Sequence, residues 1–295
     1  MNRGERLALS SVGVGCVVLA IKAFAWWLTQ SAAIYSDAVE SVVNVASSLI
    51  TLGAVHIAIK PADANHPFGH AKVEFFAAVI VGAMIVLAAL EIFREAWLAF
   101  RAPTPLGTPV LGLALNTGAT AINLLWAQLL LRAGRRDRSP ALVADGHHLM
   151  ADVVTSVGVV IGVGLAVLTG VAQIDPILAA AVGLHVLWSG ARMISGSVDG
   201  LMDAAPSPEV IERIRRIVST HAEGALEAHD LLTRHAGRLT FLEFHLVVPG
   251  GMTVEQAHDI CDRIEAALKA EMNELRITIH VEPEGKAKHR GVLVL

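Results

Sequence analysis

Long, uninterrupted apolar runs are the feature that most constrains how this chain can fold. Six of them precede the polar C-terminal third, and each is near or above the ~20 residues that a helix needs to cross a hydrocarbon core about 30 Å thick. No alternating barrel pattern accompanies the runs, so backbone hydrogen bonding in lipid requires helices. The predicted spans are Leu7–Leu28, Ala32–Ile59, Phe75–Phe100, Val110–Leu131, Leu142–Leu168 and Ile174–Ile194.

Composition supports a membrane protein. Of the 295 residues, 54% are apolar and 17% are charged, whereas soluble domains contain about 25% charged residues. The net charge of −4 gives no reason to expect nucleic acid as a partner. Cys16 and Cys261 lie in segments of different character, so no disulfide framework is expected. The first run has no evident cleavage site after it and is interpreted as a retained span.

Basic residues near the spans set the expected orientation, because Lys and Arg concentrate in cytoplasmic loops. They gather at the N-terminus and in the loops after the second and fourth spans, whereas the opposite loops carry almost none except Arg101. Both termini are therefore expected in the cytoplasm, and the short loops suit a bacterial inner membrane. The residues concerned are Arg3, Arg6, Lys60, Lys72, Arg132, Arg135, Arg136 and Arg138.

The chain becomes polar after Asp203, where Pro206-Ser207-Pro208 marks a boundary. The patterns that follow predict a small α+β domain with the order α-β-β-α-β. We therefore expect a six-helix membrane domain at residues 1–203, a cytoplasmic domain at residues 204–288 and a tail at residues 289–295. The predicted elements are helix Glu209–Ala222, strands Leu226–Arg234 and Arg238–Val248, helix Thr253–Met272 and strand Leu275–Val281.

Two of the predicted spans contain ionisable side chains, which are costly in lipid and usually functional. In each of these spans three polar residues follow the spacing i, i+3, i+7, which places them on one helix face. The two sets also look like a weak internal repeat, of the kind that places transporter sites near the midplane. The sets are Asp37, Glu40 and Asn44 in the second span, and Asp145, His148 and Asp152 in the fifth.

The two spans run in opposite directions, so these faces can meet at mid-depth. Four residues, Glu40, Asn44, His148 and Asp152, would then offer three oxygens and one nitrogen to an ion. That set suits four-coordinate Zn²⁺, although harder ions fit it as well. The alternative is that these groups only hold helices together by hydrogen bonds. The roles of Asp37 and Asp145 stay open between supporting the ligands, carrying protons and packing.

At these residues the chain resembles the cation diffusion facilitator family, and the resemblance covers nearly its whole length. Its markers are the span-two stretch Ser36–Asn44, the loop Pro61–Glu74 and the span-five pattern from His148 to Asp152. The resemblance implies a homodimer with six helices per protomer and a cytoplasmic metallochaperone-like domain. It also implies exchange of a metal ion for protons.

The family's transport site takes two residues four apart on each of these two spans, and Glu40, Asn44, His148 and Asp152 occupy those positions here. Zinc and iron carriers of the family usually have Asp or His first and Asp second on span two. Glu40 and Asn44 depart from this pattern, and Asn44 removes a negative charge, so the identity of the ion stays open.

Two further groups of residues suggest metal sites outside the spans. In the loop after span two, Asp63, His66 and His70 lie close in sequence, and related proteins bind a second ion there. The alternative is a turn capped by the aspartate with solvated histidines. The cytoplasmic domain is rich in histidine, and by resemblance five positions match a metal cluster of the family, with Glu in place of the usual Asp. They are His229, His245, His258, His280 and Glu282.

The sequence thus predicts a divalent transition-metal efflux transporter working by metal/proton antiport. Zinc is the first candidate, with Fe²⁺, Co²⁺, Cd²⁺, Ni²⁺ and Mn²⁺ as the others. The metal would be both the cargo and a regulator at the cytoplasmic domain. A membrane sensor that responds to metal without transport is the alternative. An intramembrane metallo-hydrolase is disfavoured, because the chain contains neither an H-E-x-x-H nor a G-x-S-x-G motif, so no enzyme activity is expected.

Overall fold

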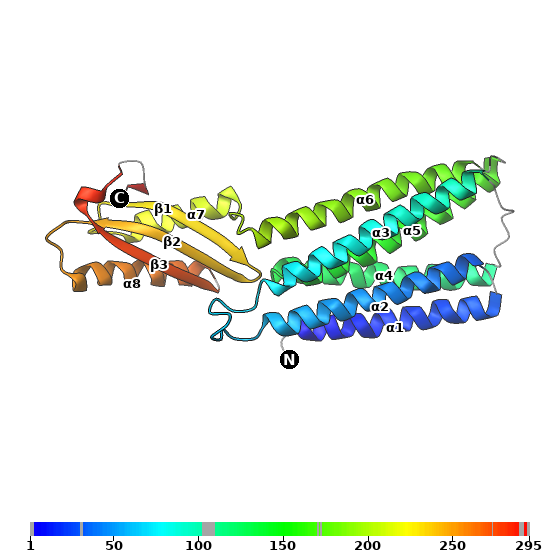
Figure 1. The fold of residues 1–295 in the computed structure, drawn as a ribbon, viewed down its shortest axis with the longest axis horizontal. Coiled ribbons are helices and arrows are strands. Elements are labelled where there is room, and N and C mark those ends of the chain that lie inside the picture. Colours follow the sequence, from blue (N-terminus) through cyan, green and yellow to red (C-terminus); the bar gives the residue numbers. More distant parts are fainter. Residues whose placement is uncertain are drawn as a thin grey trace. The chain divides into compact units, whose positions relative to one another are not determined.

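A computed structural model of the chain describes residues 3–29, 32–101, 110–169, 171, 173–272, 274–288 and 292–293. Within some helices the side chains are not described, and those of Asp37 and Glu40 are among them. The chain forms two compact units, Met1–Val198 and Asp199–Leu295. The first is a bundle of long helices and the second is a sheet with helices (Figure 1).

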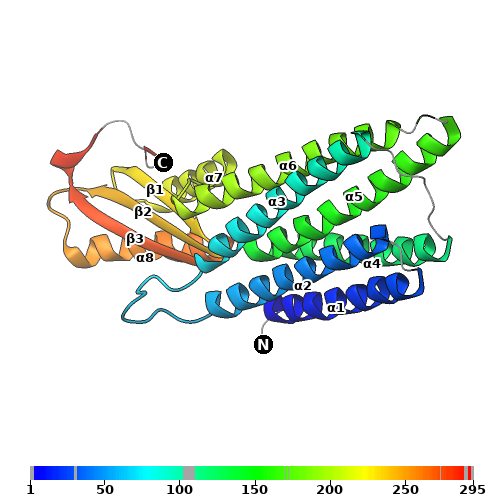
Figure 2. The same ribbon diagram turned by 45° about the vertical axis from the view of Figure 1, so that its right-hand side comes forward.

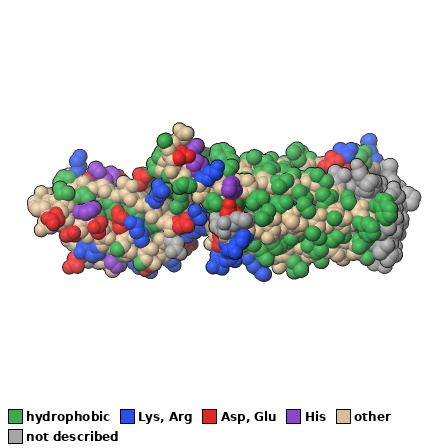
Figure 3. Space-filling model, turned by 90° about the horizontal axis from the view of Figure 1, so that it is seen from below, with side chains coloured by type: hydrophobic (Ala, Val, Ile, Leu, Met, Phe, Trp, Pro, Cys, Tyr) green, Lys and Arg blue, Asp and Glu red, His purple; other side chains and the backbone are tan. Residues whose placement is uncertain are grey.

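The first unit contains the six predicted long helices. Windows of four of them, in α1, α2, α3 and α6, are long and apolar enough to cross a membrane among the residues described. Hydrophobic side chains cover much of the surface of these helices in Figure 3. The helices are α1 (Arg3–Thr29), α2 (Ala32–Ala58), α3 (Val73–Arg101), α4 (Val110–Arg136), α5 (Pro140–Thr169) and α6 (Ile174–Leu201).

Helices α1 and α2 lie side by side in both ribbon views (Figures 1 and 2). Gly15 makes this close approach possible, since a Cβ built there would lie 3.2 Å from the Val45 side chain. Helices α3 and α6 also meet at glycines, where a Cβ on Gly190 would lie 3.0 Å from Ile85. Small residues at such contacts are typical of helix packing in membranes, where dispersion replaces the hydrophobic effect.

The second unit has the predicted α-β-β-α-β order, with one additional short strand. Its sheet has the strand order β3-β2-β1-β4, in which only the β2–β3 pair is parallel. Strand β4 lies within the segment predicted as a tail. The elements are α7 (Pro208–His221), β1 (Glu227–Ala236), β2 (Leu239–Val248), α8 (Val254–Glu271), β3 (Leu275–Pro283), the 3-10 turn η1 (Glu284–Lys286) and β4 (Val292–Leu293).

Alternation along the strands separates the two faces of this sheet. Leu242, Phe244 and Leu246 of β2 are fully buried in a core that includes Ile214 of α7 and Ile264 of α8. The residues between them on β2 therefore point to the opposite face. This pattern leaves one face of the sheet free for polar side chains.

Candidate metal centres

Polar side chains of α2 and α5 meet inside the helix bundle. The Asn44 side-chain amide donates a hydrogen bond to the Asp152 carboxylate, and both residues are buried. His148 lies one turn before Asp152 and is 2% exposed. Among the described residues, neither ring nitrogen of His148 has a hydrogen-bond partner, and neither does the Asn44 Oδ1 atom. Glu40 lies in α2, but its side chain is outside the part that is described.

Unpaired polar atoms in a buried site cost free energy unless something satisfies them. Imidazole nitrogen, amide oxygen and carboxylate oxygen are all metal ligands. The arrangement of His148, Asn44 and Asp152 therefore fits an ion site better than it fits a completed hydrogen-bond network.

Asp145, one turn before His148, has a different environment. Its carboxylate accepts hydrogen bonds from three serine hydroxyls: Ser11 at 2.5 Å, Ser47 at 3.2 Å and Ser48 at 3.1 Å. The three donors come from α1 and α2, and Asp145 is 0% exposed. Of the roles left open for Asp145, this environment favours packing, because the carboxylate ties three helices together and its oxygens already have partners.

The loop residues Asp63, His66 and His70 come together. The Asp63 carboxylate lies 3.4 Å from His66 Nδ1 and 3.4 Å from His70 Nε2, and the ring centroids are 4.4 Å apart. Asp63 Oδ1 also accepts hydrogen bonds from the backbone N–H groups of Asn65 and His66, at 2.9 and 2.7 Å. The backbone N–H of His66, with that of Asn65, lowers the pKa of the Asp63 carboxyl. The loop thus combines a capped turn with three convergent candidate ligands.

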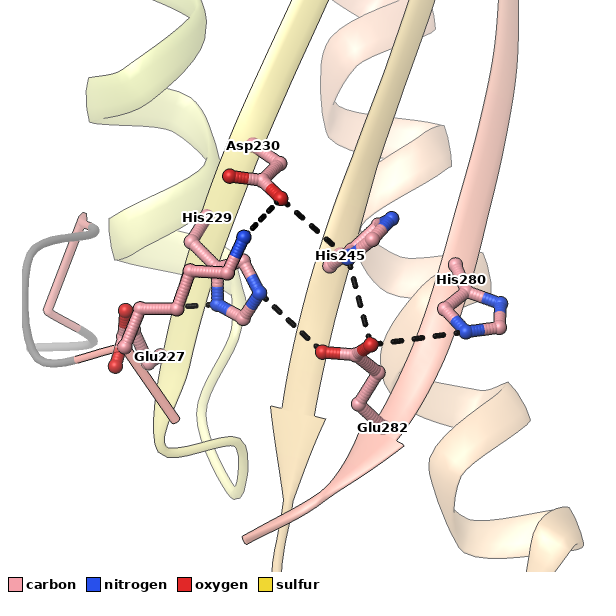
Figure 4. A network of polar contacts seen from close by, with 7 residues as sticks. Glu227, His229, Asp230, His245, His280 and Glu282 are labelled. Atoms are coloured by element: carbon pink, nitrogen blue, oxygen red, sulfur yellow. Dashed lines mark hydrogen bonds and ion pairs between the residues drawn. The ribbon is translucent and has the colours of Figure 1, made fainter. Parts of the chain in front are cut away.

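Three histidines form a row across the free face of the sheet in the second unit. His229 pairs with His245 between β1 and β2, and His245 pairs with His280 between β2 and β3. The ring centroids are 5.3 and 4.9 Å apart. Glu282 reaches all three, with carboxylate oxygens at 3.2, 3.5 and 3.8 Å from the rings of His229, His245 and His280 (Figure 4).

His229 is the most enclosed member of this row. It is buried, and neither of its ring nitrogens makes a hydrogen bond to a described residue. Carboxylate oxygens of Glu227 and Glu282 lie 3.5 and 3.2 Å away from these nitrogens. A buried imidazole between two acids is a suitable metal ligand, because its nitrogens are fixed but not otherwise engaged.

His258 is not brought to this row. It lies on α8, in the layer that covers the other face of the sheet, and its side chain is 73% exposed. The contact shown for it is to Asp262, one turn later, at 3.7 Å. Within one protomer His258 is therefore not close to the row of histidines. Its assignment to the cluster stays a prediction.

Two acidic residues join the cluster that sequence reasoning did not select. Glu227 lies two positions before His229 on β1, so strand period alone could have found it. Asp230 follows His229 directly, and simple alternation would have placed it on the opposite face. Its carboxylate nevertheless lies 3.9 Å from His245 Nδ1, and ligand atoms of His229, Asp230 and His245 lie within 4.8 Å of one another.

Comparison with known proteins gives matches along most of the chain. The family model described as the cation efflux transmembrane domain matches residues 8–202. The model described as the cytoplasmic domain of cation efflux proteins matches residues 206–284. Together these two matches cover nearly all of both units.

Full-length relatives agree with the family models. An uncharacterized transporter, sll1263, from Synechocystis is 41% identical over 94% of this chain and 89% of the relative. The cation-efflux pump FieF of Escherichia coli is 32% identical over 95% of this chain and 92% of the pump. A solved structure of CzrB in a Zn form is 53% identical, with a TM-score of 0.28, over 28% of this chain and 96% of that one.

Proposed function

Because this chain belongs to the cation diffusion facilitator family, we propose that it exports a divalent transition-metal cation from the cytoplasm, with zinc as the first candidate. The family consists of integral membrane cation transporters and is not an enzyme class. The observation that carries the proposal is the set of buried atoms on His148 and Asn44 that have no hydrogen-bond partner among the described residues, beside Asp152 where α2 meets α5.

The proposed transport site contains Glu40, Asn44, His148 and Asp152. With histidine neutral and both acids ionised, the site carries a charge of −2, so a divalent ion leaves it neutral. In the structure the Asn44 amide donates a hydrogen bond to Asp152. Ion binding would turn the Asn44 oxygen toward the metal and free the Asp152 carboxylate. This exchange of partners suits a site that must bind and then release its cargo.

Proton antiport follows from the same ligands. Histidine is the side chain whose charge changes nearest neutral pH, and metal binding requires deprotonated ligands. A proton taken up by His148 on the outer side would favour metal release there. Loss of that proton on the cytoplasmic side would restore the site. Metal export and proton import are then two directions of one cycle.

The other two sites would serve regulation and cytoplasmic capture. We propose that Asp63, His66 and His70 bind an ion in the loop, and that His229, His245, His280 and Glu282 bind one in the cytoplasmic domain, with His258 as a predicted further ligand. The proposed domains are residues 1–203 for transport and 204–288 for regulation, followed by the tail at 289–295. The protein would act as a homodimer in a bacterial inner membrane, with both termini cytoplasmic.

The test is metal uptake into proteoliposomes with an imposed pH gradient, using Zn²⁺, Fe²⁺, Co²⁺, Ni²⁺, Cd²⁺ and Mn²⁺. We expect gradient-dependent uptake of at least one ion, and its loss in Asp152→Ala. Asp137→Ala is a matched control, because Asp137 is an acid in the turn between α4 and α5, outside the proposed site. Retained uptake in Asp152→Ala would overturn the site assignment.

A membrane sensor that does not transport is the second candidate, and the histidine row on the sheet favours it. In that case no metal would enter the proteoliposomes, while metal would still bind the cytoplasmic domain. Intact binding without uptake by the wild-type protein would therefore decide for the sensor.

A further inference from the structure

Asp230 sits in a backbone conformation that most residues avoid. Its φ is 52°, in the left-handed region, and the pairing of β1 with β2 shifts register between His229 and Leu232. Such bulges re-aim side chains in a strand. Regular alternation would place Asp230 on the face of the sheet opposite to His229. The bulge instead places its carboxylate near His229 and His245. Strained positions of this kind persist where the surrounding structure fixes them, and they often belong to functional sites.

The Asp230 oxygen nearest the histidines already has a cation beside it. Asp230 Oδ2 is the atom that lies 3.9 Å from His245 Nδ1 (Figure 4). The Lys288 ammonium donates a hydrogen bond to the same oxygen. The hydrogen bond from Lys288 is the main cause that lowers the pKa of the Asp230 carboxyl. A metal ion held by His245 and Asp230 would therefore compete with Lys288 for one oxygen atom.

Lys288 belongs to the part of the chain that follows β3 and includes β4, which lies at the opposite edge of the sheet from β3. This segment, here called the strap, consists of η1, Lys288 and β4. Strand β4 pairs with Glu227 and Ala228, immediately before His229, and Lys288 contacts Asp230, immediately after it. The strap is thus attached to β1 on both sides of the buried histidine.

We propose that Asp230 is an additional ligand of the metal ion in the cytoplasmic domain, and that the Lys288 ammonium occupies its carboxylate until a metal ion displaces it. Displacement would detach one of the two attachments of the strap, so that ion binding loosens the strap over β1. The site would signal its occupancy through this segment.

The energetics favour this exchange. Lys288 and Asp230 are 52% and 43% exposed at their side chains, and ion pairs this exposed are weak. A divalent cation attracts the same carboxylate more strongly than an ammonium does, and the two cations repel each other at short range. Lysine also binds as a point charge on a flexible stem, so Lys288 can leave the carboxylate without moving the histidines on β1, β2 and β3.

The inference rests on the proposal that the histidine row binds metal, and the experiment separates the two. Full-length protein in detergent is titrated with Zn²⁺, and hydrogen exchange is followed by mass spectrometry. One peptide reports on His229 to His245 and another on β4. In the wild-type protein we expect Zn²⁺ to protect the first peptide and to expose the second.

Two variants and a control test the role of Lys288. Lys288→Met should lower the zinc midpoint of the histidine peptide by about 2- to 5-fold, as expected when a weak competitor is removed. It should also raise exchange at β4 without zinc. Lys286→Met, a lysine two residues earlier in the strap, should change neither. Asp230→Asn, which suits the left-handed backbone, should raise the midpoint by about 10-fold or more and abolish the effect of Lys288→Met.

Each other outcome overturns a defined part of the argument. A higher or unchanged midpoint in Lys288→Met would mean that Lys288 supports the ligand or is irrelevant, and the displacement model would fail. An unchanged midpoint in Asp230→Asn would remove Asp230 from the ligand set. Absence of zinc protection at the histidine peptide in the wild-type protein would defeat the metal cluster itself.

Discussion

The two proposed metal sites at α2–α5 and on the sheet use similar side chains but opposite kinds of support. In the helix bundle, His148 and Asp152 come from one face of α5, and both are buried, as is Asn44 of α2. On the sheet, each histidine comes from a different strand, and exposure rises from buried His229 to His280, which is 66% exposed. A helical site is thus built from spacing along one element, and a sheet site from register between elements.

The difference also shows in the acidic side chains that lie beside the histidines. Asp145 is buried in the bundle, where water cannot supply hydrogen bonds. Three serine hydroxyls therefore donate the hydrogen bonds that its carboxylate oxygens accept. On the sheet, Asp230 is held by a lysine at the surface, where solvent can replace that lysine at little cost. We therefore expect structural changes to follow mutation in the bundle, and affinity changes to follow mutation on the sheet.

The largest expected effect is loss of stability on replacing Asp145. Asp145→Ala leaves three buried hydroxyls without their acceptor, which should cost about 3 kcal/mol of unfolding free energy. Ser47→Ala removes one donor and should cost about 1 kcal/mol. Unfolding of the purified protein in detergent, followed by circular dichroism, would measure both. Equal stability of Asp145→Ala and wild type would show that the serine network carries no structural role.

The next largest effect should be a loss of metal affinity at the sheet. We expect this loss to be larger for a buried histidine than for an exposed one. His229→Ala should weaken zinc binding by about 100-fold, because His229 is fixed between two carboxylates before the ion arrives. His258→Ala should weaken it by a smaller factor, about 10-fold or less, because within one protomer the His258 side chain is exposed on α8 and is not held beside the row. Zinc titration of the cytoplasmic site by hydrogen exchange would compare them. Similar losses in both variants would place His258 in the cluster.

The smallest expected effect is a slower reaction of the Cys261 thiol in the folded protein. Each unit contains one cysteine, Cys16 in the first and Cys261 in the second. Burial raises the pKa of the Cys261 thiol above its ordinary value of 9.0, with Glu265 and Asp262 adding to the shift. The folded state then holds the thiol proton more firmly than the unfolded state. This stabilisation is fully present below pH 9.0 and is lost as pH rises toward the folded pKa.

Alkylation followed by mass spectrometry would measure this pH dependence. Cys261 should react several times more slowly in folded protein than after denaturation, with the difference largest at neutral pH. Cys16, which is exposed on α1 of the isolated protomer, serves as the internal reference. Rapid reaction of folded Cys261 at neutral pH would contradict the predicted burial.

The long helices could be predicted from the sequence because each depends on residues that are close together in the chain. A run of about 20 apolar residues can satisfy its backbone in lipid only as a helix, and each of the six predicted runs lies in a helix where the structure describes it. Spacing along α5 likewise places His148 and Asp152 on one face, independently of any contact with α2. The order of elements in the second unit followed from local periodicity in the same way.

Tertiary structure decided what depends on contacts between distant segments. The sequence places His229, His245 and His280 on separate strands, but only strand register aligns them in a row. It cannot reveal that Ser11, Ser47 and Ser48 converge on Asp145, or that a bulge turns Asp230 toward the histidines. Periodicity determines which face a side chain takes within its own element, whereas packing and register determine which other element that face meets.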